Sequence, residues 1–228
     1  MMKCLIGACN TVMNNRESDE NPQQHVLTAD SGNITVTPFT AELKLQTFPP
    51  EVIVSVGLVR QSVVVFGPKT AEGHRIEAIA FPWFEIVELL QKDPLFAYQI
   101  DSRKWEEIVA GSYERAGFKV ILTPRSADLG RDIIAEREAS DRTGTLRIID
   151  QVKAYGPDHL VKADEVRALV GVLAMDLSAS KGYVTTTSDF APKLRQDQLI
   201  SPLIPTRLEL LNGTQLIALL GGLNARDK

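Results

Sequence analysis

The spacing of apolar positions divides this chain into a strand-rich first part and a second part in which helices and strands alternate. Between residues 25 and 81, short runs rich in Val, Ile and Thr are separated by Gly, Pro and Asn. This pattern is typical of β-strands joined by turns. The expected strands are residues 33–39, 41–48, 51–59, 62–67 and 74–81. They predict a small antiparallel or barrel-like unit, followed by a helix that has Pro82 in its first turn.

The apolar period changes at residue 102. Trp105, Ile108 and Val109 lie at helical spacing in residues 102–118, which predicts an amphipathic helix ending near Gly117. Strands are then expected at 118–124, 131–136, 146–155, 181–188 and 207–213, with helices at 158–176, 189–199 and 214–223. This order predicts an α/β layer with a mixed sheet and helices on both faces.

Residues 93–99 (DPLFAYQ) separate the two patterns and are interpreted as a linker. A chain of 228 residues is long enough for two domains. We therefore expect a small β-rich N-terminal domain over residues 1–98, of unknown role, and a second domain over residues 99–228.

Candidate chemistry lies in two neighbouring predicted strands. Asp132 comes early in one, and Gln151 and Lys153 stand two apart in the next. Residues two apart on a strand share a face, so a carboxylate, an amide and an ammonium group would collect at one edge of the sheet. A Lys among Ile, Leu and Val is costly to bury without a partner, and a metal-dependent phosphodiesterase site would explain it.

Residues 101–222 resemble the catalytic domain of Mrr-type restriction endonucleases, within the PD-(D/E)xK nuclease superfamily. The matching segments, in order, are WEEIVAGSYERAGFKV, TPRSADLGRDIIA, DQVKAY, VRALVGVL, KGYVTTTSDFAP and LELLNGTQLIALL. The resemblance implies a restriction-endonuclease-like mixed sheet flanked by helices. Residues 1–100 contain no nuclease motif that we identify.

The resemblance also implies a site that uses Mg²⁺ or Mn²⁺. Its metal ligands would be Asp132, the backbone carbonyl of Val152, and Glu106 on the first helix. Lys153 would orient the attacking water or balance phosphate charge. Gln151 replaces the acidic residue of the superfamily motif, which removes one negative charge and favours a mechanism with one metal ion.

Each residue also has a simpler interpretation. Asp132 can pair with an Arg in a turn, and Lys153 can extend along a strand edge toward water. Glu106 can be a solvated helix residue, and Glu107 competes with it for the same role. Only the joint occurrence of these residues favours a nuclease site.

The net charge of −4 argues against a nucleic-acid-binding protein. The distribution is uneven, however: residues 1–100 carry 7 Lys and Arg against 11 Asp and Glu, whereas residues 101–228 carry 18 of each. Nucleic-acid binding by the second part is therefore permitted. Candidate phosphate contacts are Arg125, Ser126, Arg131, Thr186 and Thr187. Ordinary β-propensity explains the Thr run equally well.

The leading hypothesis is a Mg²⁺-dependent endonuclease that hydrolyses DNA phosphodiester bonds in defence against foreign DNA. Cutting both strands usually takes two sites, which favours a homodimer, and residues 1–98 would recognise DNA or dock a partner protein. One rival is a nuclease-like module that binds nucleic acid or a protein without cutting. Another is a nuclease acting on RNA or branched DNA. The presence of both Asp132 and Lys153 disfavours the inactive module.

Apolar runs and cysteines in the sequence bear on the cellular compartment of the protein. No apolar run approaches the ~20 residues that a membrane-spanning helix needs. The two cysteines, Cys4 and Cys9, lie together near the N-terminus, and the short apolar stretch around them is brief for a signal peptide. We expect a cytoplasmic protein without a structural zinc site.

Overall fold

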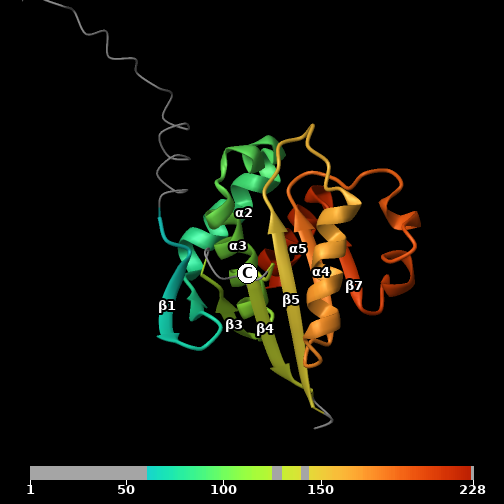
Figure 1. Ribbon diagram of the computed structural model, residues 1–228. Helices are drawn as coiled ribbons and strands as arrows, with labels where there is room; N and C mark the ends of the chain where they lie inside the picture. The colour runs from blue at the N-terminus through green and yellow to red at the C-terminus, as the bar shows by residue number, and fades with distance from the viewer. Residues whose placement is uncertain (1–60, 125–129, 140–143, 227–228) are drawn as a thin grey trace, which may run out of the picture. The chain divides into compact units, whose positions relative to one another are not determined.

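The computed structural model describes residues 61–124, 130–139 and 144–226. Within these ranges the strands form one seven-stranded sheet whose spatial order follows the sequence (Figure 1). The strands are β1 (Val64–Lys69), β2 (His74–Ala78), β3 (Lys119–Leu122), β4 (Ile133–Glu138), β5 (Thr145–Lys153), β6 (Lys181–Thr186) and β7 (Leu208–Leu211).

Strand directions change at β5. Neighbours from β1 to β5 run antiparallel, whereas β5, β6 and β7 run parallel. A parallel pair needs a crossover connection, and α4 (Ala163–Met175) provides it between β5 and β6. The predicted mixed sheet is therefore confirmed.

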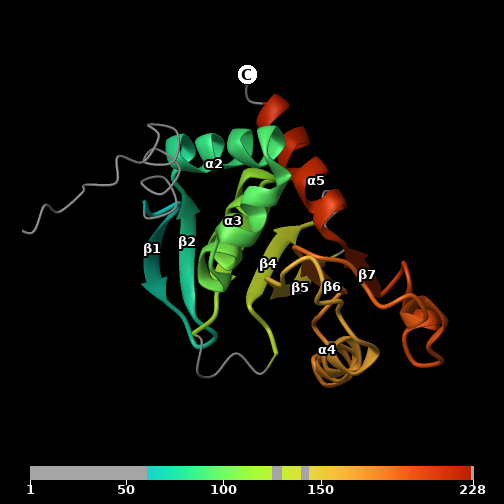
Figure 2. The ribbon, with the colours of Figure 1, turned by 90° about the horizontal axis from the view of Figure 1, so that it is seen from above.

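Helices cover both faces of the sheet, as Figure 2 shows from above. Three helices cover one face, α2 (Ala80–Lys92), α3 (Ser102–Arg115) and α5 (Gly213–Arg226), and α4 covers the other. Short 3₁₀ turns complete the fold: η1 (Pro94–Gln99), η2 (Leu194–Gln196) and η3 (Ser201–Leu203).

Side chains alternate between two hydrophobic cores along β5. Ile148 and Val152 belong to the core beneath α2, α3 and α5, whereas Ile149 belongs to the core beneath α4. This alternation is the two-residue period of a strand buried on both faces. It decides which helix layer each functional candidate on β5 meets.

The predicted boundary at residues 93–99 is wrong for the residues that the structure describes. β2 pairs with β3 in the same sheet, with His74 opposite Leu122. The indole of Trp83 donates to Ile108 O at 3.0 Å, which ties α2 to α3, and that of Trp105 donates to Ala97 O at 3.0 Å. Residues 61–98 therefore share one sheet and one core with the part that follows.

Several local predictions change in detail. The supposed linker is the 3₁₀ turn η1, and α4 begins at Ala163 rather than at residue 158. Residues 189–199 contain only the short turn η2 in place of a helix. The strands predicted at 33–59 lie outside the described residues. No helix in the described ranges is both long and apolar enough to cross a membrane.

Candidate active site

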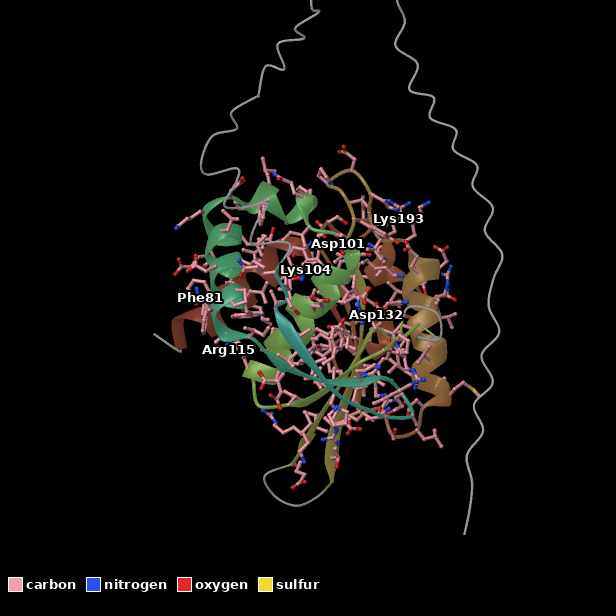
Figure 3. All side chains as sticks on the ribbon, turned by 90° about the vertical axis from the view of Figure 1, so that its left-hand side faces the viewer. Phe81, Asp101, Lys104, Arg115, Asp132 and Lys193 are labelled. Atoms are coloured by element: carbon pink, nitrogen blue, oxygen red, sulfur yellow. The ribbon has the colours of Figure 1, made fainter. Side chains whose placement is uncertain are left out.

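Asp132 lies directly before β4, where the chain enters the sheet beside β5. Its backbone N–H donates to Asp150 O at 3.1 Å, and its carboxylate Oδ2 accepts from Val152 N–H at 2.7 Å. The preceding Gly130 has φ of +77°, a conformation that other residues rarely adopt. This turn delivers the carboxylate to the edge of β5, and Figure 3 shows Asp132 flanked by α3 and α4.

Gln151 and Lys153 share the α4 side of β5. A Cβ added to Gly130 would lie 3.6 Å from both Gln151 Nε2 and a Val172 methyl group of α4. Lys153 is half-buried. Its positive charge helps lower the pKa of Glu165 on α4, together with hydrogen bonds from Lys162 N–H and the Tyr155 hydroxyl, which outweigh the opposing effect of burial. The strand therefore brings Asp132, Gln151 and Lys153 to one end of the sheet.

Three oxygen atoms at this end are suitable for a hard cation. The first is the carboxylate of Asp132. The second is Gln151 Oε1, which is buried without a hydrogen-bond partner in the described part of the chain. The third is the carbonyl of Val152, which points the same way as its N–H group and so toward Asp132. Carboxylate, amide and backbone oxygens are the ligands that Mg²⁺ and Mn²⁺ prefer.

Glu106, the other predicted metal ligand, pairs with an arginine of its own helix. Its side chain is 13% exposed and pairs with Arg103 Nη1 at 2.6 Å, and the same nitrogen donates to Thr123 O at 3.1 Å. Over the described ranges, no cluster of three His, Cys, Asp or Glu side chains is arranged to hold a metal. Glu106 as a metal ligand therefore stays a prediction, and in this structure its carboxylate neutralises an arginine. Glu107 is likewise paired, with Lys104 at 2.7 Å.

Arg131 was predicted to contact phosphate, but it belongs to an ion-pair network. Its Nη1 lies 3.6 Å from Glu72 Oε1 and 3.7 Å from Asp176 Oδ2. Arg147 joins the same carboxylates and also pairs with Glu136. Two carboxylates thus neutralise Arg131, and the network anchors the turn that precedes Asp132.

Thr186 and Thr187, the predicted phosphate contacts, have structural partners in the sheet. They are 0% and 5% exposed. Their hydroxyls donate to Lys153 O at 2.8 Å and Tyr155 O at 2.7 Å. These bonds fasten the end of β6 to the end of β5, so the Thr run is structural. Arg125 and Ser126 lie outside the described residues.

Sequence reasoning missed Asp150. This carboxyl group is 1% exposed and faces α3, where its Oδ2 accepts from the hydroxyls of Tyr113 and Thr185, each at 2.9 Å. Burial, together with a smaller contribution from the negative charge of Asp132, raises the pKa of Asp150 to about 7, even though these two hydrogen bonds oppose the shift. The available signal was an acid within the apolar run LRIID, in a strand covered on both faces.

Comparison with protein families gives a clear match. The model Mrr_cat, described as a restriction endonuclease, matches residues 97–220, more than half of the chain. The match covers the segments that carried the resemblance noted in the sequence. Comparison with curated proteins gives no match.

Three solved structures are similar at low sequence identity. The MspJI restriction endonuclease, in complex with a 27-mer oligonucleotide, is 18% identical with a TM-score of 0.37, over 67% of this chain and 37% of that one. The DNA modification-dependent restriction endonuclease AspBHI is 17% identical with a TM-score of 0.41, over 73% and 44%. A protein of unknown function, AF1548, is 13% identical with a TM-score of 0.39, over 55% and 66%. The matched regions span less than half the length of MspJI and AspBHI.

Proposed function

The chain belongs to the restriction endonuclease family described by Mrr_cat, and we propose that it is a divalent-metal-dependent endonuclease that hydrolyses DNA phosphodiester bonds. Asp132, Gln151 and Lys153 would carry the reaction. The family assignment supports DNA as the substrate, and we propose a role in defence against foreign DNA.

One observation carries the proposal: the Asp132 carboxylate lies against the Gln151–Lys153 segment, held by the 2.7 Å bond from Val152 N–H to Oδ2. Beside it stands Gln151 Oε1, an acceptor without a hydrogen-bond partner in the described ranges. A buried acceptor left unsatisfied is costly. An ion or an ion-bound water at this place would satisfy it.

The residues present fit one Mg²⁺ or Mn²⁺ ion. Asp132, Gln151 Oε1 and the Val152 carbonyl would hold it, with waters completing the shell, as Mg²⁺ usually keeps several waters and one or two carboxylates. When bound, the ion supplies an acidified water and neutralises charge that develops on the phosphate. With Gln151 in place of an acid and Glu106 paired with Arg103, the site has few negative charges, which favours one ion over two.

Lys153 would place its ammonium group beside the scissile phosphate from the α4 side of the sheet. A fixed positive charge there stabilises the additional negative charge of the transition state and orients the attacking water. The hydroxyl of Thr186 donates to the backbone carbonyl of Lys153. This bond holds the end of β5 in place and so limits the positions that the Lys153 side chain can reach.

The direct test is incubation of the purified chain with supercoiled plasmid, linear DNA and RNA, with Mg²⁺, with Mn²⁺ and with EDTA. We expect cleavage of DNA only when a divalent ion is present. Cleavage of RNA alone would assign a different substrate, and binding of DNA without any cleavage would favour the non-cutting module. Light scattering of the same sample tests the expected homodimer.

A further inference from the structure

A concave site lies on the opposite side of the sheet from Gln151 and Lys153. It is a cavity of about 410 Å³ between α3, α5 and the strands β5 to β7. Its wall is mostly apolar and includes Phe118, Leu216 and Leu219. The volume lies within the range of small-molecule sites, which are typically apolar with a few placed polar groups.

Asp150 is the placed polar group. It lines the cavity, and its Oδ2 is occupied by the hydroxyls of Tyr113 and Thr185. Its Oδ1 is buried and has no hydrogen-bond partner in the part of the chain that the structure describes. An acceptor buried in this way is costly unless a donor reaches it. Neither of the two hydroxyls supplies that donor, since both are used on Oδ2.

The wall has open space on the α5 side. A Cβ added to Gly222, which also lines the cavity, would meet nothing within 4 Å. Gly222 is itself exposed, so a larger side chain can be introduced at this part of the wall, while the polar end of the cavity stays fixed by Tyr113 and Thr185. An acidic ligand would face the Asp150 carboxyl group, so a donor is favoured over an anion at the polar end.

We propose that this cavity binds a small organic molecule with an apolar body and one hydrogen-bond-donating head, such as a primary amine. The head would donate to Asp150 Oδ1, and the body would pack against Phe118, Leu216 and Leu219. The site uses neither Gln151 nor Lys153. The proposal therefore does not depend on nuclease activity.

The probe pair is 2-phenylethylamine and 3-phenylpropionate, which share an aromatic body and differ in the head. Binding to the full chain is measured by isothermal titration calorimetry and by ligand-observed NMR at neutral pH. We expect saturable binding of the amine, and at least tenfold weaker binding of the carboxylate. No saturable binding of the amine, or equal affinity for both probes, would overturn the proposal.

Two variants locate the bound amine. Gly222→Phe adds an aromatic side chain to the cavity wall without deleting an existing contact, and Asp150→Asn removes the carboxylate; each should weaken amine binding at least tenfold. Gly171→Phe is the matched control, since Gly171 lies on α4 and an added Cβ there also meets nothing within 4 Å. Amine binding that persists unchanged in Gly222→Phe would mean that the amine binds elsewhere, and the proposal would fail even if Asp150→Asn did not fold.

Discussion

Successive side chains of β5 lie in two different chemical environments. On the α4 side, Gln151 and Lys153 stand at the end of the sheet beside the Asp132 carboxylate, and Lys153 is only half-buried. On the α3 side, Asp150 and Val152 are packed beneath helices, and Asp150 is 1% exposed. Two acids thus meet different surroundings: Asp132, at the end of the sheet, is the proposed cation ligand, whereas Asp150, beside Gln151 on β5, is enclosed.

The difference follows from the period of a β-strand and from what covers each face. Asp132 reaches the end of the sheet because a turn with positive φ at Gly130 precedes it. The side chain of Asp150 points to the other face, since its neighbours Ile148 and Val152 belong to the core beneath α3 and α5. Substitutions on the α4 side of β5 should therefore change the rate of cleavage, whereas substitutions on the α3 side should change folding stability.

The largest effect is expected on the α4 side. Lys153→Ala should lower the rate of metal-dependent DNA cleavage by ~10²–10³, the usual loss when one preorganised charge near a transition state is removed. The melting temperature should change little, because the half-buried side chain contributes little packing. Lys119→Ala is the matched control, since that side chain is 69% exposed on β3. Cleavage by Lys153→Ala at the wild-type rate would show that Lys153 has no role in the reaction.

The next effect concerns stability on the α3 side. The pKa of Asp150 is raised to about 7 in the folded chain, above the ~3.9 of an unfolded Asp. The folded state then holds a proton that the unfolded state releases between these two values, so wild-type stability should fall as pH rises from about 4 to about 7. In wild type this decrease in the free energy of unfolding amounts to about 2–4 kcal/mol, and Asp150→Asn should abolish it. Urea unfolding at pH 5 and pH 8 measures it, and equal pH dependence in both proteins would contradict the assignment.

A smaller effect is expected at Gln151. Gln151→Glu adds a carboxylate beside Asp132 and should tighten the apparent Mg²⁺ affinity by roughly tenfold, or ~1.4 kcal/mol, while cleavage persists. The Mg²⁺ dependence of the cleavage rate is the measurement. An unchanged Mg²⁺ dependence would indicate that Gln151 does not lie next to the ion. Tighter binding with slower turnover would instead show that the reaction needs the lower negative charge.

The smallest effect is expected at Val152, which would act through its backbone. Val152→Ala removes two methyl groups from the core beneath α3 and should cost about 1 kcal/mol of folding stability. Its carbonyl is retained, so Mg²⁺-dependent cleavage should be kept once the protein is folded. A loss of cleavage comparable to that of Lys153→Ala would mean that the two faces are not separable.

Much of the fold follows from local patterns. The amphipathic spacing around Trp105 predicts α3, and short apolar runs predict the strands from β3 to β7. The partners of β1 and β2 could not be predicted, since strand periodicity gives no information about pairing across 44 residues, as between Ile76 and Val120. For that reason the composition change at residues 93–99 was misread as a domain boundary.

The candidate site was predictable in part for a similar reason. Residue spacing places Gln151 and Lys153 on one face of a strand, and the structure agrees. Spacing does not show which charges are already neutralised: Glu106 pairs with Arg103, three residues earlier on the same helix, and Arg131 pairs with residues far away in the sequence. Nor does it show that the Thr186 hydroxyl donates to the backbone carbonyl of Lys153 in the neighbouring strand.

The central claim is that the Asp132 carboxylate at the end of β5 supports metal-dependent cleavage of DNA. Its most direct test is the plasmid-cleavage rate of Asp132→Asn across a Mg²⁺ titration. The exposed Asp158→Asn is the control, and circular dichroism confirms that both variants fold. We predict no product from Asp132→Asn at any Mg²⁺ concentration at which wild type and Asp158→Asn cut to completion. Wild-type cleavage by a folded Asp132→Asn, with the same Mg²⁺ dependence, would contradict the account.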